Sequence, residues 1–344
     1  MTTFESARQR AGRSARRVVP LRYAPVLVTL GLVVAMFVFG WLRYPYFGTG
    51  QVFLNLFIDN SFLLVPVVGM TFVILTGGID LSVGSVVALS TLLCAEFVLH
   101  GWPPLLAFAV VLVIGCTFGL VQGAIIHYFE IQPFNVTLAG MFLARGLCYA
   151  ITVDAISITH PQYVSISQYS LRLPGGLYLT TGALVALAVV AVGLVVLHMM
   201  RLGRTVYAVG GNAQSALLMG LGVGRTRIAV YTISGFCSAL GGILLSFYML
   251  SGSGSLAVGM ELDAIAAVVI GGTVLTGGSG YLIGSVLGVL VLGLIKTLIA
   301  FQGTLSSWWT KIVIGLLLLA FILLQRLVFA RQEVRGATST ARRI

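Results

Sequence analysis

Long apolar stretches, separated by short polar or glycine-containing segments, make up most of the chain. A helix needs about 20 predominantly apolar residues to cross a bilayer, and ten stretches reach or approach that length. The pattern therefore predicts an all-α fold, a polytopic membrane bundle of about ten transmembrane helices. The ten ranges are 25–42, 52–76, 81–99, 105–127, 136–153, 181–200, 228–250, 262–276, 281–300 and 308–325.

Charged residues are scarce and the basic ones gather in three segments. Only 8% of the residues are charged, against about 25% in soluble proteins. Six basic residues precede Tyr23, four lie in 201–227 and five follow Leu324. Lys and Arg favour cytoplasmic segments, and ten crossings from a cytoplasmic N-terminus place all three there, so the net charge of +11 reflects topology rather than nucleic-acid binding. The predicted parts are a basic cytoplasmic segment 1–24, a transmembrane domain 25–327 with a cytoplasmic loop 201–227, and a basic cytoplasmic tail 328–344.

A short motif occurs twice. The letters L-T-G-G at 75–78 return at 275–278, and each copy is followed after five residues by Gly-Ser. Each glycine in a helix interior costs about 1 kcal/mol relative to alanine, so both copies predict that helices end or change direction there. One interpretation is a short cytoplasmic turn in which Asp80 caps the next helix. The other is a broken helix beside a water-filled transport route.

Small residues and polar connections add detail to the predicted bundle. Glycines spaced four apart let two helix backbones approach closely, so two such series predict packing faces. The crossing count places 154–180 outside, with room for a short surface helix, and 251–261 is predicted to dip into the membrane. The two series are Gly115, Gly119 and Gly123, and Gly280, Gly284 and Gly288.

A few ionisable residues fall within or beside the predicted helices. A charge at the bilayer centre costs at least ~2.5 kcal/mol, so such residues face partners or water. Arg145 lies deepest and needs an acidic partner or backbone carbonyls, either in a structural ion pair or along a solute route. Glu96 and Lys311 also fit positions at the membrane surface. The intramembrane charges are Asp59, Glu96 and Arg145, and the residues predicted to line a route are Thr76, Gly77, Gly78, Asp80, Ser82 and Asp263.

The loop 201–227 contains a candidate contact site for a soluble partner. Asn212 is a natural N-cap, and Gly211 and Gly220 bound a segment that predicts a short helix ending near Met219. A short helix in a basic cytoplasmic loop suits docking, whereas the alternative is a turn that lies on the lipid surface. The residues predicted for this contact are Asn212, Ala213, Gln214, Ser215, Ala216 and Gly220.

Catalytic motifs are scarce. The letters G-G-S-G at 277–280 resemble a motif of intramembrane serine proteases, but all four histidines precede them, so none follows to act as the base. No H-E-x-x-H motif occurs, and neither lysine follows a phosphate-binding glycine-rich loop. The sequence therefore predicts that this chain is not an enzyme, needs no cofactor or metal, and does not itself hydrolyse ATP.

Several of these segments resemble the inner-membrane permease subunits of bacterial ABC importers for monosaccharides, the ribose, galactose and galactofuranose group. The resemblance extends from about Val52 to Arg326. Within the group, Gly303–Lys311 and the N-A-Q-S-A-L-L-M-G loop are most similar to the galactofuranose branch. The most specific segments are Gly69–Ser85, Ala208–Ala213 and Glu261–Thr273.

The resemblance implies a multi-pass permease in the bilayer of the bacterial inner membrane, paired with an identical or different second permease. It also implies two cytoplasmic ATPase domains and a periplasmic sugar-binding protein as partners. Asn212–Gly220 would be the coupling helix that fits a groove on the ATPase and transmits its motion. An acidic residue often stands at Gln214 or Ser215 in the group, so the docking face is less charged here.

Other transporter classes remain open on the residues alone. A proton-coupled secondary transporter would use Asp59 or Glu96 as its proton site and would work without an ATPase. An ABC permease for branched-chain amino acids shares the architecture but needs partners for charged ligand ends. A sugar instead needs a polar route, since an unpaired hydroxyl moved into hydrocarbon costs several kcal/mol. The sequence does not identify the sugar, because specificity in such importers rests mainly with the external binding protein.

Overall fold

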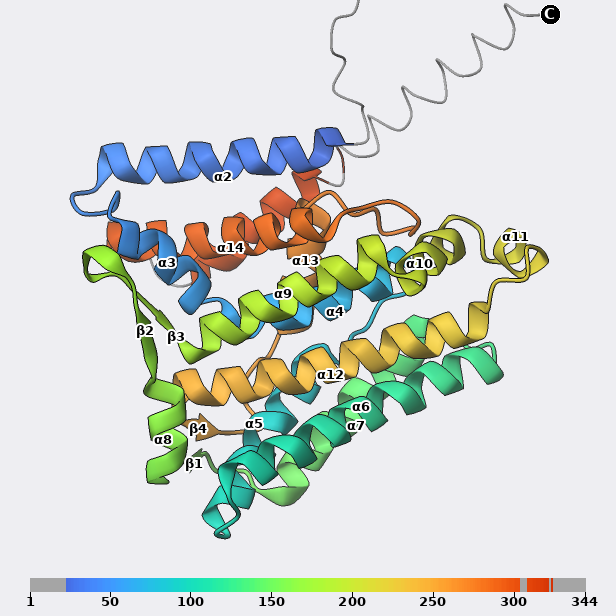
Figure 1. Ribbon diagram of the computed structural model, residues 1–344, viewed down its shortest axis with the longest axis horizontal. Coiled ribbons are helices and arrows are strands. Elements are labelled where there is room, and N and C mark those ends of the chain that lie inside the picture. Colours follow the sequence, from blue (N-terminus) through green and yellow to red (C-terminus); the bar gives the residue numbers. More distant parts are fainter. Residues whose placement is uncertain (1–22, 304–307, 322, 324–344) are drawn as a thin grey trace, which may run out of the picture.

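The computed structural model describes residues 23–303, 308–321 and 323. Within them the chain forms a bundle of helices with short strands at one end (Figure 1). Six helices are long and apolar enough to cross a membrane, and a bent pair makes a seventh. The all-helical membrane bundle is thus confirmed, while the count of ten crossings stays a prediction. The predicted tail 328–344, and nearly all of the segment 1–24, lie outside the described residues.

The helices follow the predicted apolar stretches. α3 (Gly50–Ile58) and α4 (Ser61–Leu75) together fill one stretch, with a bend of 58° between them. Two further apolar helices, α5 (Val83–Leu99) and Trp308–Phe321, are shorter than the six long ones. The long helices are α2 (Ala24–Arg43), α6 (Pro104–Tyr128), α7 (Pro133–Ile151), α9 (Thr181–Met199), α12 (Val223–Met249) and α14 (Leu282–Gln302).

The span predicted at 262–276 is wrong at its C-terminal end. α13 (Met260–Ile270) has 11 residues, and at 1.5 Å per residue it is about 16 Å long, too short to cross a bilayer. Gly272 has a left-handed backbone (φ 90°), which is typical of the residue that ends a helix. The chain then continues without helix to Tyr281. Apolar composition extended the predicted helix past the glycines that stop it.

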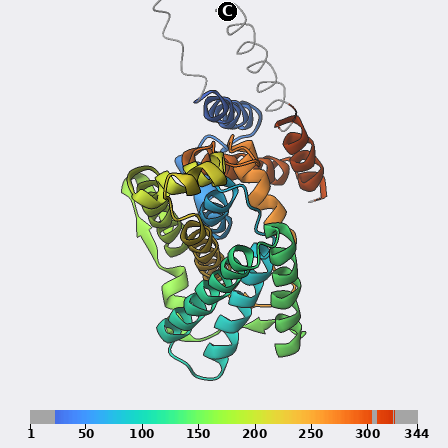
Figure 2. The same ribbon diagram turned by 90° about the vertical axis from the view of Figure 1, so that its right-hand side faces the viewer.

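The centre of the bundle is formed by α4 and α12. Of the 15 residues of α4, 14 are buried, and 67% of the most apolar part of α12 is buried, against 28% in α6 and 22% in α7. Viewed along the helices, α2 lies at one edge and α6 and α7 at the opposite edge (Figure 2). The outer helices thus leave most of their apolar surface exposed on the outside of the bundle.

The first predicted glycine packing face is confirmed, and the second is confirmed for two of its three glycines. A Cβ added at Gly115, Gly119 or Gly123 of α6 would come within 3.0 Å of the α12 backbone. In the second series, Gly284 and Gly288 pack in the same way against the backbone of Gly271 and α13. Gly280 precedes α14 and is not part of that helix face. Close backbone packing therefore joins α6 to α12 and α13 to α14.

The polar connections lie at opposite ends of the bundle (Figure 1). Segment 154–180 contains the predicted surface helix. It also contains three strands of two or three residues and a short 3-10 turn, which the sequence did not predict. At the other end lie α10 (Arg201–Gly211) and α11 (Ala213–Leu218). The elements at the first end are β1 (Ile156–Ser157), α8 (Pro161–Gln168), β2 (Ser170–Arg172), the 3-10 turn Pro174–Gly176 and β3 (Tyr178–Thr180), with β2 antiparallel to β3 and β1 antiparallel to β4 (Ser251–Gly252).

The start of α2 lies at the same end as α10. The Tyr23 ring stacks on the Tyr281 ring with centroids 5.1 Å apart, and the Tyr207 hydroxyl of α10 donates to the neighbouring Gly280 carbonyl. This agrees with the predicted placement of both segments on one side of the membrane. Which side that is stays a prediction.

Candidate functional site

The two L-T-G-G motifs, two hundred residues apart in sequence, touch in the structure. We call residues 76–82 the first glycine loop and residues 271–281 the second glycine loop. Both lie beyond helix ends, as predicted. The Gly278 amide donates a hydrogen bond to the Leu75 carbonyl oxygen at 2.9 Å. A Cβ at Gly277 would lie 2.6 Å from the Gly77 nitrogen, so the two backbones are in direct contact.

A third glycine pair, at the end of α10, packs onto this contact. A Cβ at Gly210 would overlap the Leu75 carbonyl oxygen and lie 2.5 Å from the Gly278 nitrogen. A Cβ at Gly278 would lie 2.7 Å from the Gly211 nitrogen. Such approaches require residues without side chains. We call this contact the glycine junction, and it consists of Gly77, Gly210, Gly277, Gly278 and the Leu75 carbonyl.

Asp80 of the first glycine loop is buried, with 2% of its surface exposed. One carboxylate oxygen accepts from the Ser82 amide at 2.9 Å and lies 2.6 Å from the Ser82 hydroxyl. The other accepts from the Ser234 hydroxyl of α12 at 2.6 Å. The predicted capping of the next helix by Asp80 is wrong, because Ser82 occupies the N-cap of α5 and Asp80 points toward α12. Three donors satisfy a carboxylate that would otherwise be costly to bury.

A cavity of about 370 Å³ opens beside the first glycine loop. Its volume lies within the range of small-molecule sites, roughly 300–1,000 Å³. Its wall combines irregular backbone with side chains that can donate and accept hydrogen bonds. The Tyr231 hydroxyl is buried and has no hydrogen-bond partner among the described residues. The lining residues include Thr76, Gly77, Gly78, Glu130, Arg227 and Tyr231.

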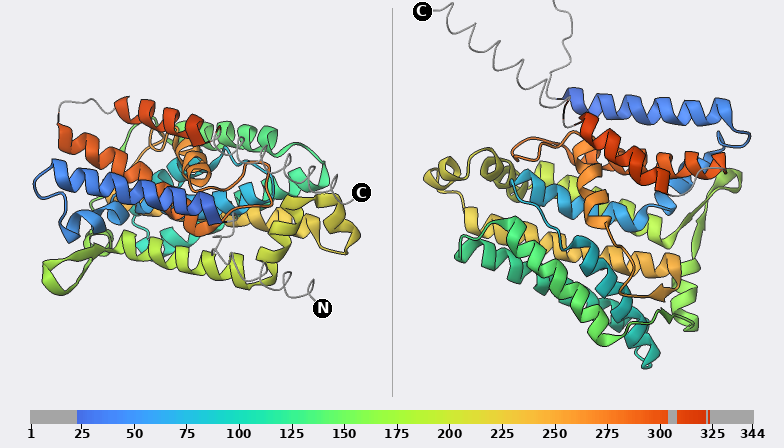
Figure 3. Two further views of the ribbon diagram at one scale, coloured as in Figure 1. Left: turned by 90° about the horizontal axis from the view of Figure 1, so that it is seen from above. Right: turned by 180° about the vertical axis from the view of Figure 1, so that it is seen from behind.

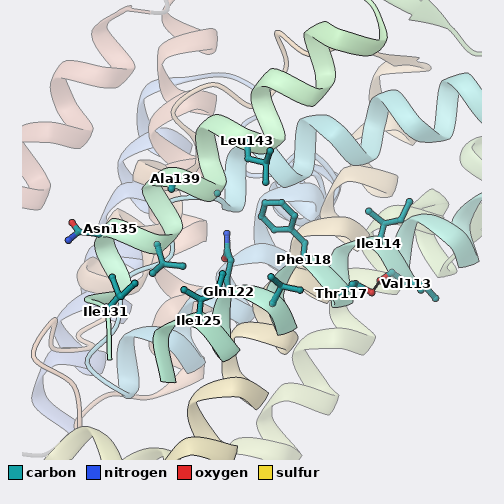
Figure 4. Close-up of a pocket in the computed structure, with 13 residues that line it drawn as sticks. Val113, Ile114, Thr117, Phe118, Gln122, Ile125, Ile131, Asn135, Ala139 and Leu143 are labelled. Atoms are coloured by element: carbon teal, nitrogen blue, oxygen red, sulfur yellow. Dashed lines mark hydrogen bonds between the residues drawn. The ribbon is translucent and has the colours of Figure 1, made fainter. Parts of the chain in front are cut away.

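A larger groove, of about 770 Å³, lies between α6 and α7 (Figure 4). Its lining is apolar apart from Thr117, Gln122 and Asn135. Gln122 projects between the two helices in Figure 4, and its Nε2 has no hydrogen-bond partner in the described part of the chain. Most hydroxyls of a polar solute would lose their hydrogen bonds in this groove. The smaller cavity is therefore the better candidate for a polar ligand.

Arg145, the deepest predicted charge, binds backbone carbonyls. Its guanidinium donates to the carbonyls of Gly254 and Leu256, the latter at 2.8 Å, in the loop that follows β4. No carboxylate lies within ion-pair distance of Arg145 among the described residues. Of the predicted alternatives, the structure shows the carbonyl contact, which attaches α7 to this loop.

The remaining predicted charges lie apart from the first glycine loop. Asp263 of α13 forms an ion pair with Lys311 at 2.8 Å, and α13 lies beside the helix Trp308–Phe321 in the view from behind (Figure 3, right). Glu96 lies 3.5 Å from His100 at the end of α5, which agrees with the predicted surface position. Asp59 is exposed at the bend between α3 and α4. The structure thus brings together Thr76 to Ser82 of the predicted route, and a role for Asp263 stays a prediction.

The short helix predicted in the loop 201–227 forms as α11. The Asn212 side-chain oxygen accepts from the Ser215 amide at 2.8 Å, which confirms the predicted N-cap. Gly220 follows the helix with a left-handed backbone (φ 77°). Ala216 is buried in a small apolar cluster with residues of α10 and α12. The helix is therefore fixed to the bundle on one side only.

The opposite side of α11 projects from the end of the bundle (Figure 1). Leu217, Leu218 and Met219 are 63%, 84% and 70% exposed. Contiguous exposed apolar residues with a polar surround mark interaction sites. The predicted contact residues Gln214 and Ser215 are also exposed. The predicted contact residues included none of these three apolar residues, although Leu218 is the most exposed of them. Exposed basic residues nearby in sequence are Arg201, Arg204 and Arg225.

Comparisons with known proteins match the chain to a family of transport permeases. Residues 52–322 match the family model described as branched-chain amino acid transport system / permease component. The chain is 46% identical to the inner membrane ABC transporter permease protein YjfF of Escherichia coli (strain K12), covering 93% of this chain and 97% of YjfF. It is 40% identical to the fructose import permease protein FruG of Bifidobacterium longum (strain NCC 2705), covering 96% and 98%. The ribose import permease protein RbsC of Bacillus subtilis (strain 168) is 37% identical, with coverages of 75% and 79%. No solved structure matches the chain.

Proposed function

The chain belongs to the branched-chain amino acid transport system / permease component family, and from this premise we propose that it is the transmembrane permease subunit of an ABC importer for a monosaccharide. The main support is its similarity, over almost the full length, to proteins named as sugar import permeases. The chain is a multi-pass protein of the bacterial inner membrane. The specific sugar that we propose is galactofuranose, from the resemblance of Gly303–Lys311 and the α11 loop to that branch.

The polar cavity beside the first glycine loop supports a route for a hydroxyl-rich solute. Thr76, Gly77 and Gly78 line it directly. Backbone carbonyls and side chains there replace the hydrogen bonds that sugar hydroxyls lose on leaving water. We propose that Asp80 and Ser82 shape this route rather than bind the sugar, since the Asp80 carboxylate already has three donors.

The exposed end of α11 supports docking of a separate ATPase. Leu217, Leu218 and Met219 offer an apolar contact, while Gln214 and Ser215 carry no charge. The exposed basic residues nearby in sequence favour a partner groove that is apolar at its floor and acidic at its rim. We further propose a second permease subunit beside this one and a periplasmic sugar-binding protein at the end that carries the strands.

A proton-coupled secondary transporter has less support. Asp59 is exposed at a helix bend, and Glu96 pairs with His100 at a helix end. Proton relays in membranes use ionisable residues that face the bundle interior or a water-filled cavity. Neither residue has such a position. The runner-up is an importer of branched-chain amino acids, which the description of the family names.

The proposal is tested by uptake into vesicles that contain the permease, the ATPase, the second permease and the binding protein of the same gene cluster. Labelled galactofuranose, ribose, fructose and leucine are supplied with and without ATP. We expect ATP-dependent accumulation of one sugar and none of leucine. Accumulation of leucine, or of a sugar by the permease alone, would contradict the proposal.

The docking site is tested by Leu218→Glu. A carboxylate at the exposed end of α11 would be desolvated in an apolar groove and repelled by its acidic rim, so we expect co-purification of the ATPase to fall at least about tenfold. Leu171→Glu is the matched control, because Leu171 is an exposed leucine of β2 at the opposite end of the bundle. Equal ATPase binding by both variants would refute the docking assignment.

A further inference from the structure

α10 and α11 follow one another without a linker. α10 ends at Gly211, and the next residue, Asn212, caps α11. Ala216 of α11 also packs into the cluster that contains Val209 of α10. A displacement of α11 is therefore passed directly to the last turn of α10.

The last turn of α10 contacts the end of α4 and the second glycine loop through backbone atoms. Gly210 has no room for a side chain between the Leu75 carbonyl and the Gly278 amide. Leu75 and Gly278 are themselves joined by a hydrogen bond of 2.9 Å. Backbone atoms at this separation cannot yield as side-chain rotamers do, since packed interfaces move as units rather than deform continuously. Movement of Gly210 therefore moves the second glycine loop and the end of α4, where the first glycine loop begins.

A second contact ties α10 to the second glycine loop. The Tyr207 hydroxyl, one helical turn before Gly210, donates to the Gly280 carbonyl at 2.8 Å. Tyr207 and Gly210 thus hold opposite ends of the short segment Gly278–Gly280. The segment is attached to α10 at two points, so α10 can pull on it as well as push.

The first glycine loop leads from this contact to the proposed route. Leu75 is the last residue of α4, the most buried helix, and the next residues line the cavity. Asp80, further along the same loop, is bound to α12 through Ser234. A force applied at Leu75 therefore acts between the two central helices, beside the cavity.

We infer that the glycine junction is the joint through which the ATPase, docked on α11, opens and closes the route, with Gly210 and Tyr207 as its positioning residues. The inference rests on the proposed function and adds the connection from the docking helix to the route. It predicts that a damaged joint leaves docking and ATP hydrolysis in place and disconnects them from transport.

The test compares Gly210→Ala with Gly211→Ala in the full complex. The two glycines are adjacent, but an added Cβ at Gly211 meets no atom within 4 Å and its φ is not positive. For Gly210→Ala we expect ATPase co-purification and basal ATP hydrolysis to stay within about twofold, while sugar uptake falls at least about tenfold, the size of a typical coupling between sites. Gly211→Ala should keep ATPase co-purification, basal ATP hydrolysis and sugar uptake all within about twofold of the unmodified complex.

Tyr207→Phe provides a second test that adds no atoms. Loss of one hydrogen bond should lower uptake about fivefold without loss of the ATPase. This variant decides the matter if Gly210→Ala does not assemble. Normal uptake by Gly210→Ala or by Tyr207→Phe, or an equal loss in Gly211→Ala, would overturn the inference. Failure of the docking assignment would show separately, as normal ATPase binding by Leu218→Glu.

Discussion

The two glycine loops make the same turn and then use it differently. The Gly77 amide donates to the Ile74 carbonyl at 2.9 Å, and the corresponding Gly277 amide donates to Val274 at 3.0 Å. At the second glycine they diverge. In the first copy its amide donates to Val73, within the same copy, whereas the Gly278 amide donates across to Leu75 of the other copy. The repeated letters therefore specify a turn, and the surroundings decide what the turn contacts.

The five residues after each glycine pair carry the rest of the difference. They read I-D-L-S-V in the first copy and S-G-Y-L-I in the second, so Asp80 corresponds to Gly280 and Ser82 to Leu282. The first copy places a carboxylate and a hydroxyl in the bundle interior, where the hydroxyl donates to the carboxylate and Ser234 of α12 donates to the same carboxylate. The second places a bare backbone within reach of α10. One loop is built around polar side chains, and the other is held by its backbone.

Removal of the polar centre of the first loop should have the largest effect. Asp80→Ala leaves the Ser82 and Ser234 hydroxyls without their buried acceptor, so we expect a loss of about 3 kcal/mol of stability and no measurable uptake. Thermal unfolding of the purified permease and sugar uptake are the measurements. Ser279→Ala, an exposed position in the second loop, is the control and should change neither. Normal uptake by Asp80→Ala would show that transport does not depend on the polar side chains of the first loop.

A smaller effect, on stability, is expected from alanine at the first glycine of each pair, Gly77 or Gly277. Gly77 and Gly277 both have left-handed backbones, φ 81° and 88°, so alanine at either costs roughly 1–2 kcal/mol. At Gly277 the new Cβ would also lie 2.6 Å from a backbone nitrogen, whereas at Gly77 the nearest atom is 3.2 Å away. Gly277→Ala should therefore unfold at the lower temperature. The opposite order would indicate that the loops do not touch in the membrane.

The smallest effect should come from the serines that end each repeat. Ser285 links α14 to α4, because its hydroxyl lies 2.9 Å from that of Thr71, whereas the Ser85 hydroxyl donates locally to the Ser82 carbonyl. Ser285→Ala should cost about 1 kcal/mol and Ser85→Ala less. Unfolding of the two variants, measured side by side, checks this difference, and equal midpoints would contradict it.

Local features were predictable from the sequence. The apolar stretches gave the helix positions, and α11 follows from Asn212 and its flanking glycines. The end of α13 was predictable as well, because Gly271-Gly272 is a helix-ending signal. The predicted span ran past it because the residues on both sides are apolar. The third glycine pair, Gly210-Gly211, was present in the sequence as well, but nothing marked it as a partner of the others.

Contacts between distant segments were not predictable. The glycine junction joins backbone atoms, which are the same in every residue, so the contact leaves no side-chain pattern to find. Asp80 shows the same limit in another way. An aspartate just before a helix is commonly a cap, and only the position of Ser234, 154 residues later, explains why this one turns inward. Arg145 likewise required a partner, but the choice of carbonyls over a carboxylate depends on the path of the loop after β4.

That choice has a consequence for how this contact tolerates sequence drift. The carbonyl oxygens of Gly254 and Leu256 belong to the main chain, whereas the donors belong to the Arg145 side chain alone. A substitution at Leu256 keeps the acceptor, and a substitution at Arg145 removes both hydrogen bonds at once. The attachment of α7 to this loop therefore depends on the identity of the arginine.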